Sequence, residues 1–253
     1  PGDCVWGSTN SDTSIVLVGD SNAGHFSESF IGAAKSANSR LTIETRSGCP
    51  FIDVEVSEEG ANSRQEPCRG FVKRVTSELK EQEPELVLIA NSTDLYLQEE
   101  SRTLIDPQTG KPAKNPQEEA KVFEAGLNRT STSLAQSGIK VVIVEVPPKP
   151  RAALIDFDPD GCSALLLWTD GARCSFPDFS ADEPTTVEAN RIERGAARAS
   201  RSTTWSFSDV ICPHGRCAEH DSDVPVWSDD DHISVGTAKS LIPKATEYLR
   251  EIS

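Results

Sequence analysis

Two short segments near opposite ends of the chain carry the residue types of nucleophilic catalysis. Ser21 closes a Gly-Asp-Ser triplet after an apolar run, and Asp229 stands three residues before His232. A serine on a strand-to-helix turn places its hydroxyl above the sheet edge, and a histidine held by a carboxylate supplies the base that a serine requires. Taken alone, Ser21 could simply cap the helix that follows it. His232, taken alone, could be an incidental residue of a solvated acidic turn. Together they predict chemistry through a serine ester.

The chain between these segments alternates short apolar runs with helical patterns. We expect strands near residues 14–19, 41–45, 86–90, 140–146 and 203–207, and helices near 26–37, 71–79, 123–134, 187–199 and 234–249. This alternation predicts an α/β fold, a three-layer αβα sandwich with a central parallel sheet of about five strands. Working residues then lie at the carboxyl ends of the strands, where Ser21 is expected.

The length of 253 residues favours one domain over residues 1–253, with loop-rich insertions near 98–116 and 147–184. The sequence contains no Met and starts at Pro1. We therefore expect a processed product or a fragment of a longer protein.

The charge balance excludes one class of partner. Lys and Arg number 25 against 40 Asp and Glu, a formal net charge of −15. Nucleic-acid binding needs clustered basic residues, which the sequence lacks, so we expect no nucleic-acid partner. No apolar run approaches the roughly 18 residues of a membrane span.

Seven cysteines are many for a cytosolic protein, and six of them have local neighbours. The spacing pairs Cys49 with Cys68, Cys162 with Cys174 and Cys212 with Cys217, which leaves Cys4 over. Such pairs favour an oxidising compartment outside the cytoplasm, although spacing alone leaves the connectivity open.

Two segments imitate metal sites. Residues 156–161 alternate acidic side chains like a calcium loop, but Leu167 stands where a bidentate Glu is needed. Cys212, Cys217 and His220 could be taken for zinc ligands, but a small disulfide loop fits an exported chain better. We therefore expect no metal and no cofactor.

The two catalytic segments together resemble the SGNH (GDSL) esterase and acyltransferase family. Further features of this kind are Cys4 before the first strand, the Gly-Cys-Pro at residues 48–50 and the cysteine-paired late loops. They look like the extracytoplasmic SGNH domain behind the membrane-embedded acyltransferase-3 domain of bacterial O-acyltransferases. The resemblance implies an SGNH, flavodoxin-like fold with disulfide-pinned insertions.

The resemblance also assigns catalytic roles. Ser21 would be the nucleophile, His232 the base and Asp229 the orienting acid, with Asp230 as the fallback. His25, one helical turn after Ser21, is expected at the pocket wall or surface rather than in the chemistry.

The resemblance places the oxyanion hole at Ser21, Gly48 and Asn91. In the family, the second sequence block supplies a glycine N–H to the oxyanion hole, and Gly48 is the best match to that glycine. The third block supplies an asparagine, and Asn91 follows the third expected strand. The family's usual motif at this place is Gly-x-Asn-Asp, whereas residues 90–94 of this chain read Ala-Asn-Ser-Thr-Asp. Asp94 cannot donate a hydrogen bond when it is ionised.

The function that follows is an extracytoplasmic O-acyltransferase, which passes an acyl group, expected to be acetyl, to a hydroxyl of a cell-envelope carbohydrate or glycolipid. Its expected partner is a membrane-embedded acyltransferase-3 domain upstream in the same chain, which would tether it to the membrane. Two alternatives stay open: a carbohydrate esterase that uses water as acceptor, and a non-catalytic docking domain.

Overall fold

The computed structural model describes residues 5–58, 65–98, 102–150, 175–177, 183–218, 220–221 and 224–252. The expected pair Cys162–Cys174, the calcium-like segment 156–161 and Cys4 lie outside the described residues, as does most of the 147–184 insertion.

A six-stranded sheet forms the centre of the fold, in the order β1-β3-β2-β5-β8-β10. The strands are β1 (Val5–Gly7), β2 (Ser14–Gly19), β3 (Arg40–Thr45), β5 (Leu86–Ala90), β8 (Lys140–Val144) and β10 (Thr203–Trp205). The five strands from β3 to β10 pair in parallel, which confirms the prediction. The sheet is nevertheless mixed, because the short edge strand β1, which the sequence analysis did not anticipate, runs antiparallel to β3.

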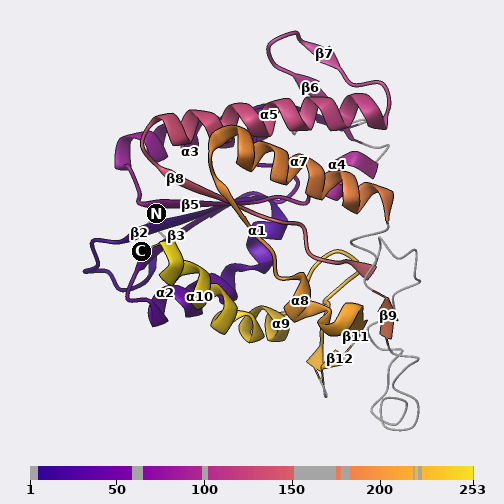
Figure 1. Cartoon of the computed structure of the whole chain (residues 1–253). Helices are drawn as coiled ribbons and strands as arrows, with labels where there is room; N and C mark the ends of the chain where they lie inside the picture. The colour runs from indigo at the N-terminus through magenta and orange to yellow at the C-terminus, as the bar shows by residue number, and fades with distance from the viewer. Residues whose placement is uncertain are drawn as a thin grey trace.

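Helices cover both faces of this sheet (Figure 1). One layer consists of α3 (Gln65–Gln82), α5 (Pro116–Gln136) and α7 (Pro184–Ser200), and the other of α2 (Ser27–Ser36), α9 (Val235–Ser240) and α10 (Ile242–Ile252). The three-layer αβα sandwich is therefore confirmed.

Alternating side chains of the strands feed two separate cores. In β2, Val16 and Val18 join the core beneath α3, α5 and α7, whereas Ile15 and Leu17 join the core on the opposite face. Since both faces are covered, the strand is apolar along its length and shows no polar alternation.

Smaller elements surround this sandwich. A three-stranded sheet contains β4 (Glu55–Glu58), β6 (Arg102–Asp106) and β7 (Lys111–Pro112), so the 98–116 insertion is partly a hairpin that pairs with β4. The remaining elements are α1 (Ser21–His25), α4 (Thr93–Gln98), α8 (Ser208–Ile211), a 3-10 turn (Pro213–Gly215), β9 (Ser175–Pro177), β11 (Arg216–Ala218), β12 (His220–Asp221) and β13 (Val224–Pro225).

Two of the expected disulfides are confirmed. Cys49 bonds to Cys68, which attaches the loop after β3 to α3, and Cys212 bonds to Cys217 across a small loop. Because both sulfurs of the Cys212 loop are bonded to each other, this loop offers no thiolate to zinc.

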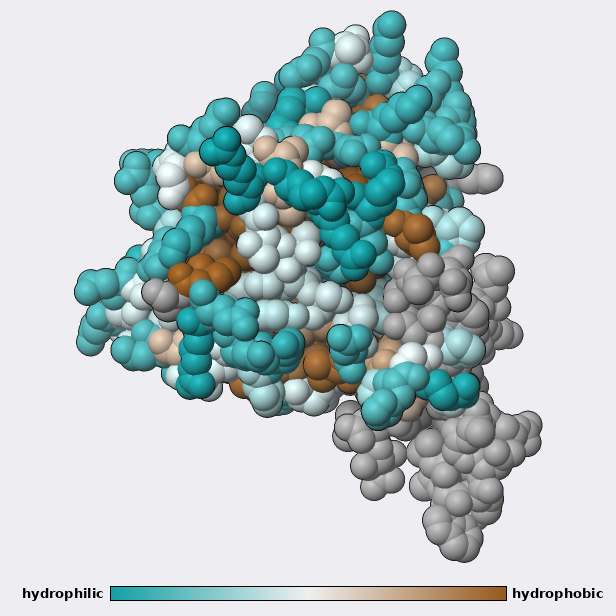
Figure 2. Space-filling view, viewed as in Figure 1, coloured by the Kyte–Doolittle hydropathy of each residue, from teal (hydrophilic) through white to brown (hydrophobic). Residues whose placement is uncertain are grey.

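The surface is mainly hydrophilic in the face shown in Figure 2, with small scattered apolar areas. None of the helices in the described ranges is both long and apolar enough to cross a membrane.

Candidate active site

Ser21 is the first residue of α1, directly after the carboxyl end of β2. Gly19 pairs with Ala90 on β5, and a Cβ at Gly19 would lie 1.8 Å from the Ala90 carbonyl oxygen. Only glycine therefore lets β2 and β5 approach this closely where the chain turns into α1. Asp20 caps the helix by accepting a 2.8 Å hydrogen bond from the Asn22 N–H.

The Asp20 carboxylate also connects Ser21 to the end of β5. It accepts hydrogen bonds from the Ser92 N–H, at 2.9 Å, and from the Tyr96 hydroxyl, at 3.0 Å. Burial raises the pKa of Asp20 above its usual value, although these donors act in the opposite direction. Burial and the neighbouring Asp20 raise the pKa of Tyr96, so its hydroxyl stays protonated and donates. These hydrogen bonds of Asp20 therefore hold the turn that carries Ser21 against the segment that follows β5.

His232 lies on a tight turn before α9. The turn is closed by the bridge between Trp227 and Ile233 and by a 2.9 Å hydrogen bond from the Ser228 N–H to the His232 carbonyl oxygen. The Trp227 side chain is fully buried and donates through Nε1 to the Pro148 carbonyl oxygen, at 3.3 Å. The turn is therefore anchored to the loop that follows β8.

Within this turn, Asp229 contacts the imidazole directly. Its Oδ2 lies 2.9 Å from His232 Nδ1, and its Oδ1 accepts a 2.7 Å hydrogen bond from the His232 N–H. Asp230, the fallback, is exposed to solvent. Asp231 approaches the other ring nitrogen, with Oδ2 at 3.6 Å from Nε2. Nε2 is buried and makes no hydrogen bond within the described part of the chain.

His25 joins the Ser21 and His232 segments. It lies one helical turn after Ser21 on α1, and its ring centroid is 5.9 Å from that of His232, in an edge-to-face arrangement. Both of its ring nitrogens are buried and lack a hydrogen-bond partner among the described residues. Burial lowers the pKa of His25 well below its usual value, and the positive charge of Lys149 and the charge that His232 carries when protonated act in the same direction. A neutral imidazole therefore forms part of the site wall.

The expected oxyanion residues lie on the loops that follow β3 and β5. Gly48 is buried and adopts a left-handed φ of 70°, next to the Cys49–Cys68 disulfide. The Asn91 side-chain oxygen accepts a 2.8 Å hydrogen bond from the Phe51 N–H. This bond ties the two loops together and leaves the amide NH₂ of Asn91 as the group that can donate elsewhere.

Sequence reasoning missed a buried ionic cluster beside these residues. Its members among the described residues include Ser92, Asp94, Lys149 and Asp231, and Lys149 Nζ contacts both carboxylates at 2.8 Å. The only sequence signal was a lysine between two prolines, directly after a buried strand, in a place where loops carry functional groups.

A further buried carboxyl group supports the cluster from α7. Glu193 lies 2.5 Å from the Thr93 hydroxyl through Oε1 and accepts a 3.1 Å hydrogen bond from the Val146 N–H. Burial raises the pKa of Glu193 from 4.5 to about 8. This side chain therefore links α7 to the ends of β5 and β8, largely in its protonated form at neutral pH.

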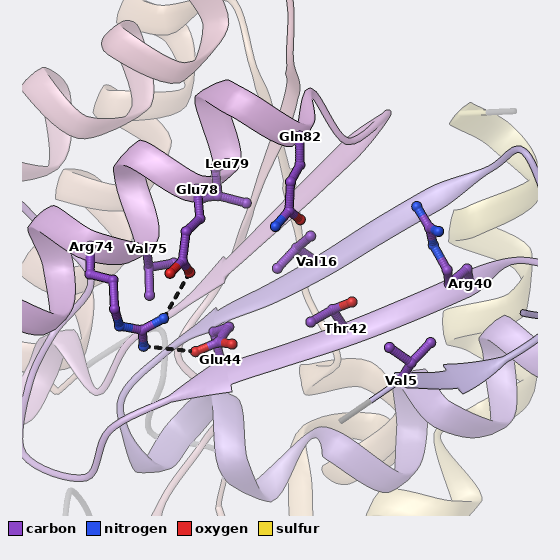
Figure 3. Close-up of a pocket in the computed structure, with 10 residues that line it drawn as sticks. All are labelled: Val5, Val16, Arg40, Thr42, Glu44, Arg74, Val75, Glu78, Leu79 and Gln82. Carbon is purple, nitrogen blue, oxygen red and sulfur yellow. Dashed lines mark hydrogen bonds and ion pairs between the residues drawn. The ribbon is translucent and has the colours of Figure 1, made fainter. Parts of the chain in front are cut away.

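A hollow of about 520 Å³ lies elsewhere, between α3 and the β3 edge of the sheet (Figure 3). At one end of it, Arg74 pairs with Glu44 at 3.0 Å and with Glu78 at 2.7 Å. Neither Ser21 nor His232 lines it, so it is separate from the candidate active site. Among the described residues, no group of three or more His, Cys, Asp and Glu side chains is arranged to hold a metal ion.

Known structures share this architecture. The periplasmic domain of a lipopolysaccharide acetyltransferase from Salmonella ser. Paratyphi A superposes with a TM-score of 0.65 and 15% identity, over 95% of this chain and 85% of that chain. A single-substitution mutant of Axe2, an acetyl-xylooligosaccharide esterase from Geobacillus Stearmophilus, gives a TM-score of 0.53 and 14% identity, over 98% and 95% of the two chains. An acetyl xylan esterase, AlAXEase, superposes with a TM-score of 0.55 and 10% identity, over 93% of this chain and 99% of that chain. At these identities the similarity shows the fold.

No curated protein matches the chain. The family model described as "SGNH domain (fused to AT3 domains)" matches residues 1–247. The chain therefore belongs to the family of SGNH domains that are fused to AT3 domains.

Proposed function

We propose that this domain is an extracytoplasmic O-acyltransferase that carries an acyl group, acetyl in the simplest case, on Ser21 and passes it to a carbohydrate or glycolipid hydroxyl of the cell envelope. The observation that carries the proposal is the contact of Asp229 with His232 Nδ1, at 2.9 Å, in a turn that meets the α1 segment of Ser21. Residues 1–253 would act as one catalytic domain, because the segments of Ser21 and His232 lie near opposite ends of the chain and meet, and one sheet joins the elements between them.

In the first half-reaction, His232 Nε2 accepts the proton of the Ser21 hydroxyl as Oγ attacks the acyl carbonyl carbon of the donor. The bond from the acyl carbon to the leaving oxygen breaks, and that oxygen takes the proton from His232. Asp229 holds Nδ1–H, so that Nε2 carries the lone pair, and it stabilises the imidazolium while the proton is held. The product is an acyl ester of Ser21.

In the second half-reaction, an acceptor hydroxyl replaces the donor. His232 takes its proton, the acceptor oxygen attacks the ester carbon, and Ser21 Oγ leaves with the proton from His232. The negative oxygen of each tetrahedral intermediate would be held by the N–H groups of Ser21 and Gly48 and by the Asn91 side chain. These donors lie on loops fixed by the Asp20 contacts, the disulfide and the Phe51 hydrogen bond.

The family supports a transferase and its partner. Because related SGNH domains are fused to AT3 domains, a membrane-embedded acyltransferase-3 domain is the proposed source of the acyl group. The similar periplasmic domain belongs to a lipopolysaccharide acetyltransferase, and this supports an extracytoplasmic location and an envelope acceptor. Disulfides such as Cys49–Cys68 fit the same compartment.

A second candidate is an esterase that transfers the same acyl group to water. It is supported by the similar folds of the two acetyl-sugar esterases. The two functions share the first half-reaction and differ only in the acceptor. Transfer prevails over hydrolysis only where the protein positions a hydroxyl and so raises its effective concentration above that of water.

The test is a partition experiment. The purified chain is given p-nitrophenyl acetate together with a series of acceptors: glycerol, methyl glycosides and bacterial lipopolysaccharide. The acetylated acceptor and free acetate are then quantified. We expect acetylated carbohydrate to form with the wild type and with Ser36→Ala, an exposed-serine control, and not with Ser21→Ala. Free acetate with every acceptor would favour the esterase, and unchanged turnover in Ser21→Ala would exclude both candidates.

A further inference from the structure

The peptide group between Asn91 and Ser92 is held on both sides by the neighbours of Ser21. Its carbonyl oxygen, which belongs to Asn91, accepts a 3.0 Å hydrogen bond from Asn22 Nδ2. Its N–H, which belongs to Ser92, donates to Asp20 Oδ2 at 2.9 Å. Asp20 and Asn22 flank Ser21 in the sequence. The two residues beside the proposed nucleophile therefore fix the orientation of this single peptide group.

The side chain of Asn91 is held from a third direction. Its Oδ1 accepts a 2.8 Å hydrogen bond from the Phe51 N–H, on the loop after β3. Because a backbone N–H can only donate and a backbone carbonyl can only accept, these partners determine which end of the Asn91 and Asn22 amides is oxygen and which is nitrogen. The direction of the Asn91 NH₂ therefore follows from the backbone that Asn22 and Asp20 hold and from the bond to Phe51.

The contact between Asn22 and Asn91 depends on the close approach of β2 and β5 just before these residues. Gly19 pairs with Ala90, and a Cβ at Gly19 would clash with the Ala90 carbonyl oxygen. The Asn22 side chain then points from α1 to the end of β5, across 69 residues of sequence. Both asparagines are buried, at 1% and 4% exposure, so water does not compete for this hydrogen bond.

Stability alone does not account for a buried asparagine at position 22. The amide oxygen of Asn22 is buried and has no hydrogen-bond partner among the described residues. Leaving a buried acceptor unpaired costs at least as much free energy as one hydrogen bond typically contributes. The bond to Asn91 therefore adds little net stability, and what it supplies is the position of the Asn91 backbone.

We propose that Asn22 is a positioning residue of the acyl-transfer site: it holds the Asn91 backbone so that the Asn91 NH₂ is directed at the oxyanion that forms beside Ser21. The negative oxygen exists only in the tetrahedral intermediate, so the benefit of a well-placed donor appears in the rate of the chemical step. This inference rests on the proposed function, because it assumes that Asn91 donates to the acyl oxygen.

The experiment is a double-mutant cycle on the purified chain. Asn22→Ala, Asn91→Ala and the double variant are compared with the wild type through kcat/KM for p-nitrophenyl acetate and through the thermal unfolding midpoint. Ser131→Ala is the matched control, because it also removes a buried hydrogen bond from a side chain to a backbone carbonyl, that of Leu127 within α5.

We expect Asn22→Ala to lower kcat/KM by about 10-fold or more, because a displaced oxyanion donor loses much of its effect. In the Asn91→Ala background the same substitution should cost less than about threefold, since the donor that Asn22 positions is already absent. Ser131→Ala should lower the unfolding midpoint and leave kcat/KM within about twofold of the wild type. If Asn22 had only a structural role, its replacement would also lower the midpoint, but the loss in kcat/KM would not depend on Asn91.

An equal loss in both backgrounds would overturn the inference, and so would wild-type kcat/KM in a folded Asn22→Ala or Asn91→Ala variant. Should Asn22→Ala fail to fold, Asn22→Leu fills the same space without a donor and decides in its place, with the same expected dependence on Asn91. A wild-type protein that neither turns over the ester nor reacts with a fluorophosphonate would instead refute the proposed function.

Discussion

The carboxylate of Asp229 contacts His232 at two points, the ring Nδ1 at 2.9 Å and the backbone N–H at 2.7 Å. The backbone contact fixes the turn, and the ring contact selects the tautomer with the proton on Nδ1 and the lone pair on Nε2. One side chain therefore sets both the place and the protonation pattern of the proposed base.

The first prediction concerns this choice of tautomer. In Asp229→Asn the amide can still accept from the His232 N–H, but its NH₂ favours the opposite tautomer. We expect kcat for p-nitrophenyl acetate to fall by at least about 100-fold, with little change in the unfolding midpoint. Asp230→Asn, one residue along the same turn, should stay within about twofold of wild type. A larger loss in Asp230→Asn than in Asp229→Asn would contradict the assignment.

The second prediction concerns Asn91. Replacement by Ala removes the proposed oxyanion donor and also the acceptor of the buried Phe51 N–H. We expect kcat to fall by about 100-fold, and the free energy of unfolding by about 1–3 kcal/mol. The rate of Ser21 modification by a fluorophosphonate should fall in proportion to kcat, since its tetrahedral adduct uses the same donors. A variant that is less stable but turns over normally at a permissive temperature would give Asn91 a structural role only.

The third prediction concerns the disulfides. Cys49→Ser with Cys68→Ser should lower the free energy of unfolding by about 2–4 kcal/mol, because the bond closes a loop of 19 residues. It should also lower kcat, because Gly48 loses its bonded neighbour. Cys212→Ser with Cys217→Ser opens a separation of only 5 residues and should cost less. Peptide mapping without reduction checks both bonds and the predicted Cys162–Cys174 bond.

The fourth prediction concerns Glu193, whose pKa is raised by burial from 4.5 to about 8. Between these pH values the folded chain holds a proton that the unfolded chain has released, so this group lowers stability as pH rises. Glu193→Gln keeps both hydrogen bonds without the ionisation. The free energy of unfolding of the variant relative to wild type should therefore increase from pH 5 to pH 8, by about 1–3 kcal/mol.

Chemical denaturation of the variant and the wild type at several pH values measures this difference. Burial also raises the pKa of Glu119, to about 7, and its ionisation affects stability with the same sign. Because both proteins contain Glu119, its contribution cancels in the difference, which therefore reports on Glu193. Exposed Glu81→Gln is the control and should show no trend. A difference that stays flat across this range would contradict a buried, protonated Glu193.

Local sequence predicted much of the fold. Residues 86–90 form a strand within the expected limits, because a continuous apolar run reflects cover on both faces. The edge strand β1 escaped prediction because it has three residues and exists through pairing with β3, far along the chain. The strand expected over residues 140–146 ends at Val144, ahead of two prolines.

The candidate site also contains residues that local sequence indicates and residues that only the folded chain brings together. Ser21, Asp229 and His232 belong to compact motifs, so their spacing could be interpreted directly. Lys149 meets Asp94 and Asp231 only after the strands assemble, across 55 and 82 residues of sequence. No local pattern encodes such a contact, because it depends on which loops the sheet order brings together.

In the proposed mechanism, Ser21 carries the acyl group. The most direct measurement is mass spectrometry of the protein after rapid acid quenching during turnover of p-nitrophenyl acetate, followed by peptide mapping. We expect one added acetyl group, located on the peptide that contains Ser21, in the wild type and in Ser36→Ala, and none in Ser21→Ala. An acetyl group on another residue during turnover, or wild-type turnover in Ser21→Ala, would show that Ser21 does not carry the acyl group.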